Sequence, residues 1–324
     1  MGDLERKIQL FHEVFPKLSR FEKTDWEENF LVEFTHDSTS IEGNTLTLIE
    51  TKMILADAIV PAETTLRELD EVRGHADAWQ FVKDCVRENV LLSENIIKDI
   101  HERVIPVRGA GGIYRDVPVY IRGAQHVPPN PRKVWDAMKN FAYRMEHDTF
   151  SSPIEKAAWL HAEFVKIHPF QDGNGRTARL IMNYHLLAND FPPTSIKLKN
   201  RDEYFSALEE YALQDSLTSF SSLLHKNMER EMDAFLSMYA QHIDLHQLRR
   251  KSPALAPLAN AYLQDDGLTQ GEKKEKTAAL RSEKGKGAEK TIANHMPLKR
   301  HKRLSQSFIF KTQGKSSISR KNPF

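Results

Sequence analysis

The sequence predicts an all-α protein with one small β-like insertion and a disordered C-terminal tail. Apolar residues recur at helical spacing through most of the first 265 residues. The exception is the segment 106–131, where glycines and prolines surround a short alternating stretch, Val117-Pro-Val-Tyr-Ile-Arg122, which predicts a small β-hairpin or flap. After about residue 265 the periodicity stops and Lys, Gly, Ser and Gln dominate, a composition typical of disorder.

Start and stop signals place the individual helices. A helix around residues 26–43 carries an apolar stripe and ends at Gly43, which can adopt the left-handed conformation of a C-cap. Capping boxes predict two more helices, one that opens at Thr47 and is closed by Pro61, and one that opens at Thr65. Further helices are expected at about 93–104, 131–147, 154–166, 175–187, 201–214, 218–240 and 241–250.

Charge is divided unevenly along the chain. The 46 Lys and Arg residues nearly balance the 45 Asp and Glu residues, which gives a formal net charge of +1. Residues 271–324, however, hold 15 basic and 4 acidic residues, so the rest of the chain is acidic. A basic tail of this kind, with its cluster Lys299-Arg-His-Lys-Arg303, indicates either solvated disorder or an electrostatic contact with nucleic acid.

Several classes of protein are excluded by what the sequence contains. The single cysteine, Cys85, allows neither an intramolecular disulfide nor a Cys-rich zinc site, and we expect it to be inert packing on a helix. The first residues lack a secretory core, Arg6 breaks the myristoylation pattern, and no apolar run approaches the ~18 residues of a membrane span. The expectation is a soluble, cytoplasmic protein that contacts no membrane.

Residues 167–179, Ile-His-Pro-Phe-Gln-Asp-Gly-Asn-Gly-Arg-Thr-Ala-Arg, concentrate reactive groups between two expected helices. The first helix ends at His168, because a proline disfavours helix at the residue before it. The glycines let the backbone approach a ligand closely, and N–H groups at the next helix start form an anion site. His168 is a candidate general base and Asp172 a candidate Mg²⁺ ligand, while Arg176 and Arg179 can grip phosphate oxygens.

The same segment is compatible with simpler interpretations. The loop could be a plain turn in which His168 and Asp172 cap helix ends. It is neither a Walker A loop, since no Gly-Lys-Ser/Thr follows, nor a dinucleotide-binding fingerprint, since no strand precedes it. His161 and His168 lie two helical turns apart but lack a third ligand for zinc. We therefore expect His161, like His101, to be a packed, hydrogen-bonded residue that supports the site.

The stretch from His168 to Arg179 resembles the Fic family, whose signature His-x-Phe-x-Asp/Glu-Gly-Asn-Gly-Arg-x-x-Arg it matches at every position. The resemblance covers about residues 30–240 and extends through Gly112-Ile-Tyr-Arg115, His126-Val-Pro-Pro129, Arg201 and Tyr204. It implies a Fic-fold helical bundle in four parts: an N-terminal helical region (1–90), a catalytic core (91–240) with its flap at 106–131, a helical extension (241–265) and the basic tail (266–324).

By this resemblance the protein is a nucleotidyltransferase that moves AMP from ATP, with Mg²⁺, to a Ser, Thr or Tyr hydroxyl of a protein. His168 would deprotonate the hydroxyl, Asp172 would hold Mg²⁺, and Arg176 and Arg179 would bind the β- and γ-phosphates. Asn174, with the backbone of Gly173 and Gly175, would stabilise charge on the reacting phosphate. Nucleotide contacts are also implied for Gly123, Ala124, Gln125, His126 and Tyr204, and Phe170 is expected to pack in the core.

Ser38-Thr-Ser-Ile-Glu42-Gly43 resembles the inhibitory motif of the family, Ser/Thr-x-x-x-Glu-Gly/Asn. By that resemblance Glu42 pairs with Arg179 and occupies space that the γ-phosphate needs. The same carboxylate could instead position a water that removes AMP from a modified protein. Transfer of UMP, phosphocholine or a phosphoryl group, self-modification, a homodimer, and regulation through nucleic acid bound by residues 271–324 also stay open.

Overall fold

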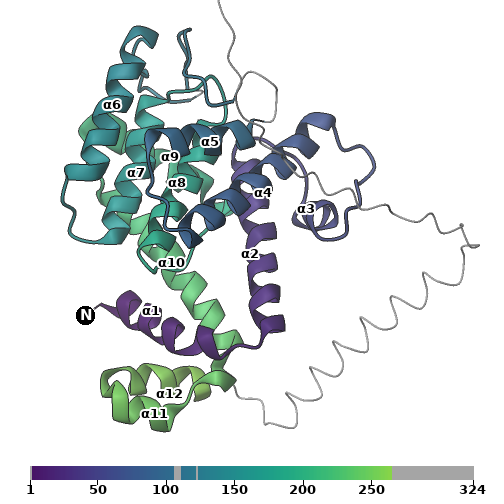
Figure 1. Cartoon of the computed structure of the whole chain (residues 1–324), viewed down its shortest axis with the longest axis vertical. Helices are drawn as coiled ribbons and strands as arrows, with labels where there is room; N and C mark the ends of the chain where they lie inside the picture. Colours follow the sequence, from purple (N-terminus) through teal and green to yellow (C-terminus); the bar gives the residue numbers. More distant parts are fainter. Residues whose placement is uncertain (1, 106–110, 122, 265–324) are drawn as a thin grey trace, which may run out of the picture. The chain divides into compact units, whose positions relative to one another are not determined.

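The computed structural model describes residues 2–105, 111–121 and 123–264, and these ranges contain twelve α-helices and no strand (Figure 1). The tail for which disorder was predicted lies outside the described residues. Within the described ranges, no helix is both long and apolar enough to cross a bilayer. The helices are α1 (Asp3–Val14), α2 (Arg20–Ile41), α3 (Leu48–Leu55), α4 (Leu66–Arg87), α5 (Glu94–Val104), α6 (Pro131–His147), α7 (Pro153–Ile167), α8 (Asn174–Ala188), α9 (Arg201–Gln214), α10 (Thr218–Met238), α11 (Leu245–Lys251) and α12 (Ala256–Gln264).

The predicted helix starts are confirmed by the caps that form. The Thr47 and Thr65 side chains each accept a hydrogen bond from the N–H three residues on, and the Glu there bonds back to the cap. Gly43 follows α2 with a φ of 102°, the left-handed conformation expected of it. A third capping box, at Ser19, starts α2 earlier than the apolar stripe indicated. α1 and α12 were not predicted as separate helices.

Helix α3 ends sooner than the sequence suggested, at Leu55 rather than near Pro61. Two residues after the C-cap, Ala58 adopts a left-handed φ of 54°, and the N–H of Ile59 returns to the carbonyl of Met53 at 2.9 Å. This turn satisfies the carbonyl at the helix end before the proline is reached. A small apolar cluster then fixes α3 on α4; its members are Leu46, Ile54, Leu69 and Val72.

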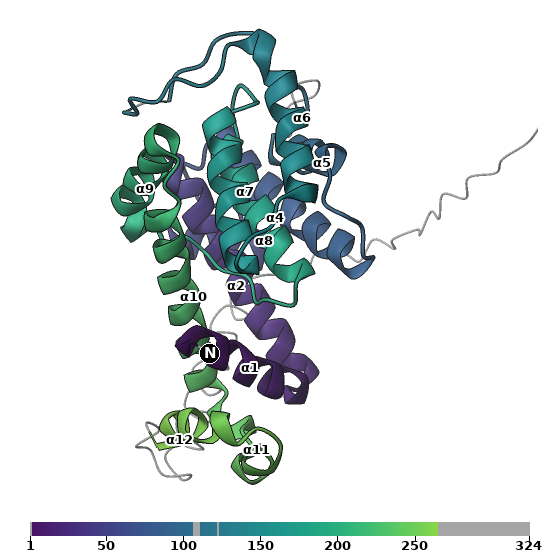
Figure 2. The ribbon, with the colours of Figure 1, turned by 90° about the vertical axis from the view of Figure 1, so that its left-hand side faces the viewer.

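The expected β-hairpin does not form among the described residues. Residues 111–121 and 123–130 contain turns and extended backbone but no paired strands, and Arg122 lies outside the described part of the chain. Three prolines in this segment, Pro118, Pro128 and Pro129, have no N–H to donate to a ladder, which explains the difference. Figure 2 shows the segment as a long loop that projects beyond the start of α6.

Helices α7 and α8 form the centre of the bundle (Figures 1 and 2). α8 packs against α7, α4, α5 and α2, while α7 also packs against α6, α9 and α10. α8 is buried on nearly every side, and its buried residues include polar ones: Asn174, Arg176, Thr177, Arg179 and Asn183. Burying polar groups without partners costs free energy, so the helices around α8 must supply partners for most of them. The loop between α7 and α8 therefore lies where several helices can supply partners.

Candidate active site

His168 ends α7 in the left-handed conformation, with φ 51° and ψ 60°. Its Nδ1 lies 3.2 Å from the carbonyl of Val165. Because a carbonyl can only accept, Nδ1 carries the proton in the neutral ring and Nε2 keeps its lone pair. Burial lowers the pKa of His168 from its ordinary value; the Val165 carbonyl and Glu42 oppose this, and the charges of Arg115 and His126 add to it. The imidazole is therefore suited to accept a proton near neutral pH.

The loop from Asp172 to Gly175 is held in shape by Asn174. Its side-chain amide accepts from the N–H of Phe170 and donates to the carbonyl of Phe170, both at 2.9 Å. Gly173 has a φ of 75°, and a Cβ there would lie 3.0 Å from Cδ1 of Ile105. α8 begins at Asn174, so the N–H groups of this loop form the anion-binding end of a buried helix.

His101 on α5 supports the same loop, as expected for a packed histidine. Its Nδ1 accepts from the N–H of Gly112 at 2.9 Å, and its Nε2 lies 2.9 Å from the carbonyl of Asp172. These partners fix the neutral tautomer with the proton on Nε2. The ring stacks on Phe170 with centroids 3.6 Å apart. Burial lowers the pKa of His101 to about 4, so the ring stays neutral and keeps both bonds at physiological pH.

Arg179 on α8 is fully buried and bonded along its whole guanidinium. Its Nε and Nη2 donate to the hydroxyl and carbonyl of Ser38 at 2.9 and 2.7 Å, and Nη2 also donates to Oε1 of Glu42 at 2.8 Å. Nη1 donates to the hydroxyl of Tyr204 at 3.0 Å. His161 Nε2 lies 3.2 Å from that hydroxyl, as expected for a residue that supports the site. The predicted pairing of Glu42 with Arg179 is thus present in the structure.

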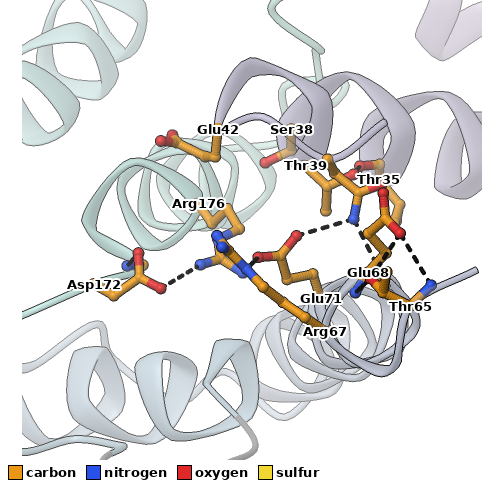
Figure 3. A network of polar contacts seen from close by, with 12 residues as sticks. Thr35, Ser38, Thr39, Glu42, Thr65, Arg67, Glu68, Glu71, Asp172 and Arg176 are labelled. Carbon is orange, nitrogen blue, oxygen red and sulfur yellow. Dashed lines mark hydrogen bonds and ion pairs between the residues drawn. The ribbon is translucent and has the colours of Figure 1, made fainter. Parts of the chain in front are cut away.

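Arg176, one turn earlier on α8, points toward Asp172 and Glu71 (Figure 3). Its Nη2 donates to Oδ2 of Asp172 at 3.2 Å, and its Nη1 lies 4.0 Å from a carboxylate oxygen of Glu71 on α4. Only 2% of the Arg176 side chain is exposed. The two arginines therefore face different carboxylates, and a phosphate contact for Arg176 stays a prediction.

The segment after Glu42 is anchored by α4 (Figure 3). Nδ2 of Asn44 donates to a carboxylate oxygen of Glu71 at 2.9 Å and to the carbonyl of Glu68 at 3.2 Å. The Glu68 carboxylate accepts from both the N–H and the hydroxyl of Thr45. Sequence reasoning missed Glu68 and Glu71 in this role, because nothing local pairs residues more than twenty positions apart.

A cavity of about 410 Å³ opens beside the loop, a size typical of small-ligand sites. Its lining brings together Glu42, His168, Gly175 and Tyr204 with the flap residues Gly123, Ala124, Gln125 and His126. Glu209 on α9, which sequence reasoning also missed, accepts from the N–H groups of Gln125 and His126 at 2.7 and 3.2 Å. Asp172, Arg176 and Arg179 do not line the cavity.

The metal prediction rests on one carboxylate. The described residues contain no cluster of three or more His, Cys, Asp or Glu side chains that could hold an ion alone. The Asp172 side chain is 67% exposed, and its Oδ1 accepts from the N–H of Gly173. Mg²⁺ is commonly held by one or two carboxylates plus phosphate oxygens, so this donor set fits it only together with a phosphate ligand.

Comparison with known proteins agrees with this geometry. Residues 91–186 match the protein family described as "Fic/DOC family". "Protein adenylyltransferase Fic" of Drosophila virilis is 30% identical over 235 residues, covering 71% of this chain and 46% of that protein. The protein of the same name from Nematostella vectensis is 34% identical over 209 residues, covering 62% of this chain and 48% of that protein.

Solved structures of Fic-domain proteins are also similar to this chain. Fic-1 (residues 134–508) from C. elegans superposes with a TM-score of 0.60 at 27% identity, covering 74% of this chain and 72% of that chain. A Fic-domain-containing signalling protein from Bacteroides thetaiotaomicron, at 24% identity, shares the fold with a TM-score of 0.63 and covers 70% and 94% of the two chains. The chain therefore carries a Fic domain of the Fic/DOC family. It spans about half the length of the curated relatives it matches.

Replacing His101 with Gln tests its role as a neutral clamp. The folded pKa of about 4 lies below the ordinary value of 6.5, so its contribution to stability is complete above pH 6.5 and is lost as the pH falls toward 4. Over this range the wild type should lose roughly 3 kcal/mol more unfolding free energy than His101→Gln, whose amide can make both bonds but does not titrate. Urea unfolding from pH 7 to 4 measures the difference. Parallel curves for the two proteins would contradict the clamp.

Proposed function

We propose that the protein transfers AMP from ATP to a hydroxyl side chain of a protein. The observation that carries the proposal is that one cavity is lined both by His168 and by Gly175 at the N-terminal end of α8. Relatives with 30% and 34% identity that bear the name protein adenylyltransferase support it. His168 takes the proton of the target hydroxyl, whose oxygen forms the new bond to the α-phosphorus. The bond to pyrophosphate breaks, and pyrophosphate leaves with the electron pair.

The remaining roles follow from where each group lies. The N–H groups at Gly173–Gly175 stabilise negative charge on the α-phosphate. Asp172, together with the phosphates, would hold Mg²⁺, which would supply positive charge beside the leaving group. The nucleoside lies against residues 123–126 and Tyr204, where the cavity is walled by the flap and α9. Exchange of Glu42 for a γ-phosphate would give Arg179 an anionic partner in the same place.

We further propose that Glu42 is a brake on this activity. Its Oε1 lies so close to the α8 end that a Cβ on Gly175 would be 2.1 Å from it. The carboxylate thus occupies the place at the helix start where an anion would bind, and it already holds Arg179. A nucleotide with a γ-phosphate must displace it.

Replacing Glu42 with Gly should raise AMP transfer, because Arg179 and the helix end become free for phosphate. A hydrogen bond between charged groups contributes about 1.5–3 kcal/mol, so a rise of roughly 10–100-fold is expected. Intact-mass analysis with Mg²⁺ and each of the four nucleoside triphosphates identifies the group transferred. The matched control combines Glu42→Gly with His168→Ala, and its AMP transfer should be at least about 10²-fold lower than that of Glu42→Gly alone. Equal labelling by wild type and Glu42→Gly would contradict the brake.

The anchoring of Asn44 generates a second prediction. Asn44→Ala removes both bonds to α4, which loosens the segment that follows Glu42 and should raise AMP transfer about 3–10-fold. The same change made in Glu42→Gly should have no effect, because no brake is left to loosen. A double-mutant cycle on initial transfer rates measures this coupling. A similar loss in both backgrounds would mean that Asn44 matters for folding alone.

One observation favours removal of AMP as a second activity of the same site. The Glu42 side chain is 33% exposed and lines the cavity that His168 also lines, so its carboxylate could orient a water toward a bound AMP group. Release of AMP from a modified protein by wild type but not by Glu42→Gln would separate this role from the brake.

A further inference from the structure

Arg115 is a buried cation whose partners are all backbone carbonyls. Only 3% of the residue is exposed, and among the described residues no carboxylate acts on its charge. Its Nε donates to the carbonyl of His168 at 2.8 Å, Nη1 to that of Val117 at 3.2 Å, and Nη2 to that of Pro129 at 2.5 Å. Its own N–H donates to the carbonyl of Pro169 at 2.9 Å. A buried charge with this many neutral acceptors is costly unless each bond is kept.

The four acceptors belong to two separate structures. His168 and Pro169 start the loop that carries the candidate general base. Val117 and Pro129 belong to the flap and lie on either side of its residues 118–128. Arg115 therefore connects the loop to two points of the flap, Val117 and Pro129. It can make these bonds together because the planar guanidinium holds its N–H donors in several fixed directions.

Both structures need such a connection. A left-handed backbone at a residue with a side chain is strained and persists only where its surroundings fix it, and the His168 carbonyl is one group through which this occurs. The described flap has no strand ladder to hold it, and its middle is fixed instead by Glu209. Without Arg115 these two points of the flap and the His168 carbonyl would lose their common partner.

We propose that Arg115 is the positioning residue that holds His168 at a fixed place relative to the flap. The inference rests on the proposed function for the identity of the reaction. Because the bonds of Arg115 keep the distance from His168 to the flap constant, Nε2 stays within hydrogen-bond reach of the hydroxyl that attacks. Arg115 does not line the nucleotide cavity and donates no hydrogen bond to a residue assigned to phosphate, so it acts on transfer through His168 and the flap.

The Arg115 charge also bears on His168. The charged or titratable groups that act on the imidazole are Glu42 from α2, which raises its pKa, and Arg115 and His126 from the loop and flap, which lower it. Loss of the guanidinium charge should therefore raise the pKa of His168, whereas a lysine should keep much of the effect. Comparing the two substitutions therefore distinguishes the effect of the Arg115 charge from the effect of its hydrogen-bond geometry.

The test uses the full chain with the Glu42→Gly change, alone and with Arg115→Lys, Arg115→Gln or the control Arg103→Lys. Arg103 on α5 also donates to a backbone carbonyl, that of Asp99 at 2.8 Å, but its guanidinium lies over the ring of Phe81 on α4. Four quantities are measured: ATP affinity, self-modification by intact mass, amide hydrogen exchange over residues 117–129, and the imidazole titration of His168 by NMR.

For Arg115→Lys we expect ATP affinity within about twofold of the parent, transfer lower by about 10²-fold, and faster exchange over the flap. Arg115→Gln should change transfer and flap exchange in the same way and should also raise the pKa of His168. Arg103→Lys should equal the parent in all four quantities. Transfer and flap exchange at parental levels would overturn the proposal, as would a parallel loss of ATP binding and transfer. If the Glu42→Gly parent transfers no nucleotide, the proposed function fails, and flap exchange with the His168 titration still decides the role of Arg115.

Discussion

The burial of Arg179 is the constraint on which the rest of the site depends. A guanidinium with no exposed surface is tolerable only when its donors are bonded, and its partners come from two other helices. α2 supplies Ser38 and Glu42, and α9 supplies Tyr204. These helices must pack on α8 for the charge to be satisfied. The position of α2 is thereby tied to that of α8 and the loop at its start.

Among these partners only one can be exchanged without exposing the arginine. Ser38 and Tyr204 are almost fully buried, whereas the Glu42 side chain is 33% exposed and faces the cavity. An incoming phosphate can therefore replace one anion with another while the other bonds persist. In the proposed mechanism, the strength of the brake would depend on what holds the end of α2, namely the bonds from Asn44 and Thr45 to α4.

Local sequence signals were enough to predict most of the helices and the loop between α7 and α8. Capping boxes at Thr47 and Thr65 placed helix starts, and the stretch from His168 to Arg179 brought the base, the glycines and the arginines together because it is contiguous. The roles of Glu71, Glu209 and Arg115 could not be predicted, since each depends on segments that meet only after the helices pack. The hairpin expectation was wrong for the described flap residues because the prolines of the flap lack the N–H groups that strand pairing needs.

The central claim is that Glu42 competes with the terminal phosphates of ATP for Arg179. The most direct measurement is calorimetric titration of wild type and Glu42→Gly with ATP and, separately, with AMP, each with Mg²⁺. The account predicts that the substitution tightens ATP binding by about tenfold or more and leaves AMP binding nearly unchanged, because AMP lacks the phosphates that meet the arginine. Equal changes for the two nucleotides, or none for ATP, would contradict it.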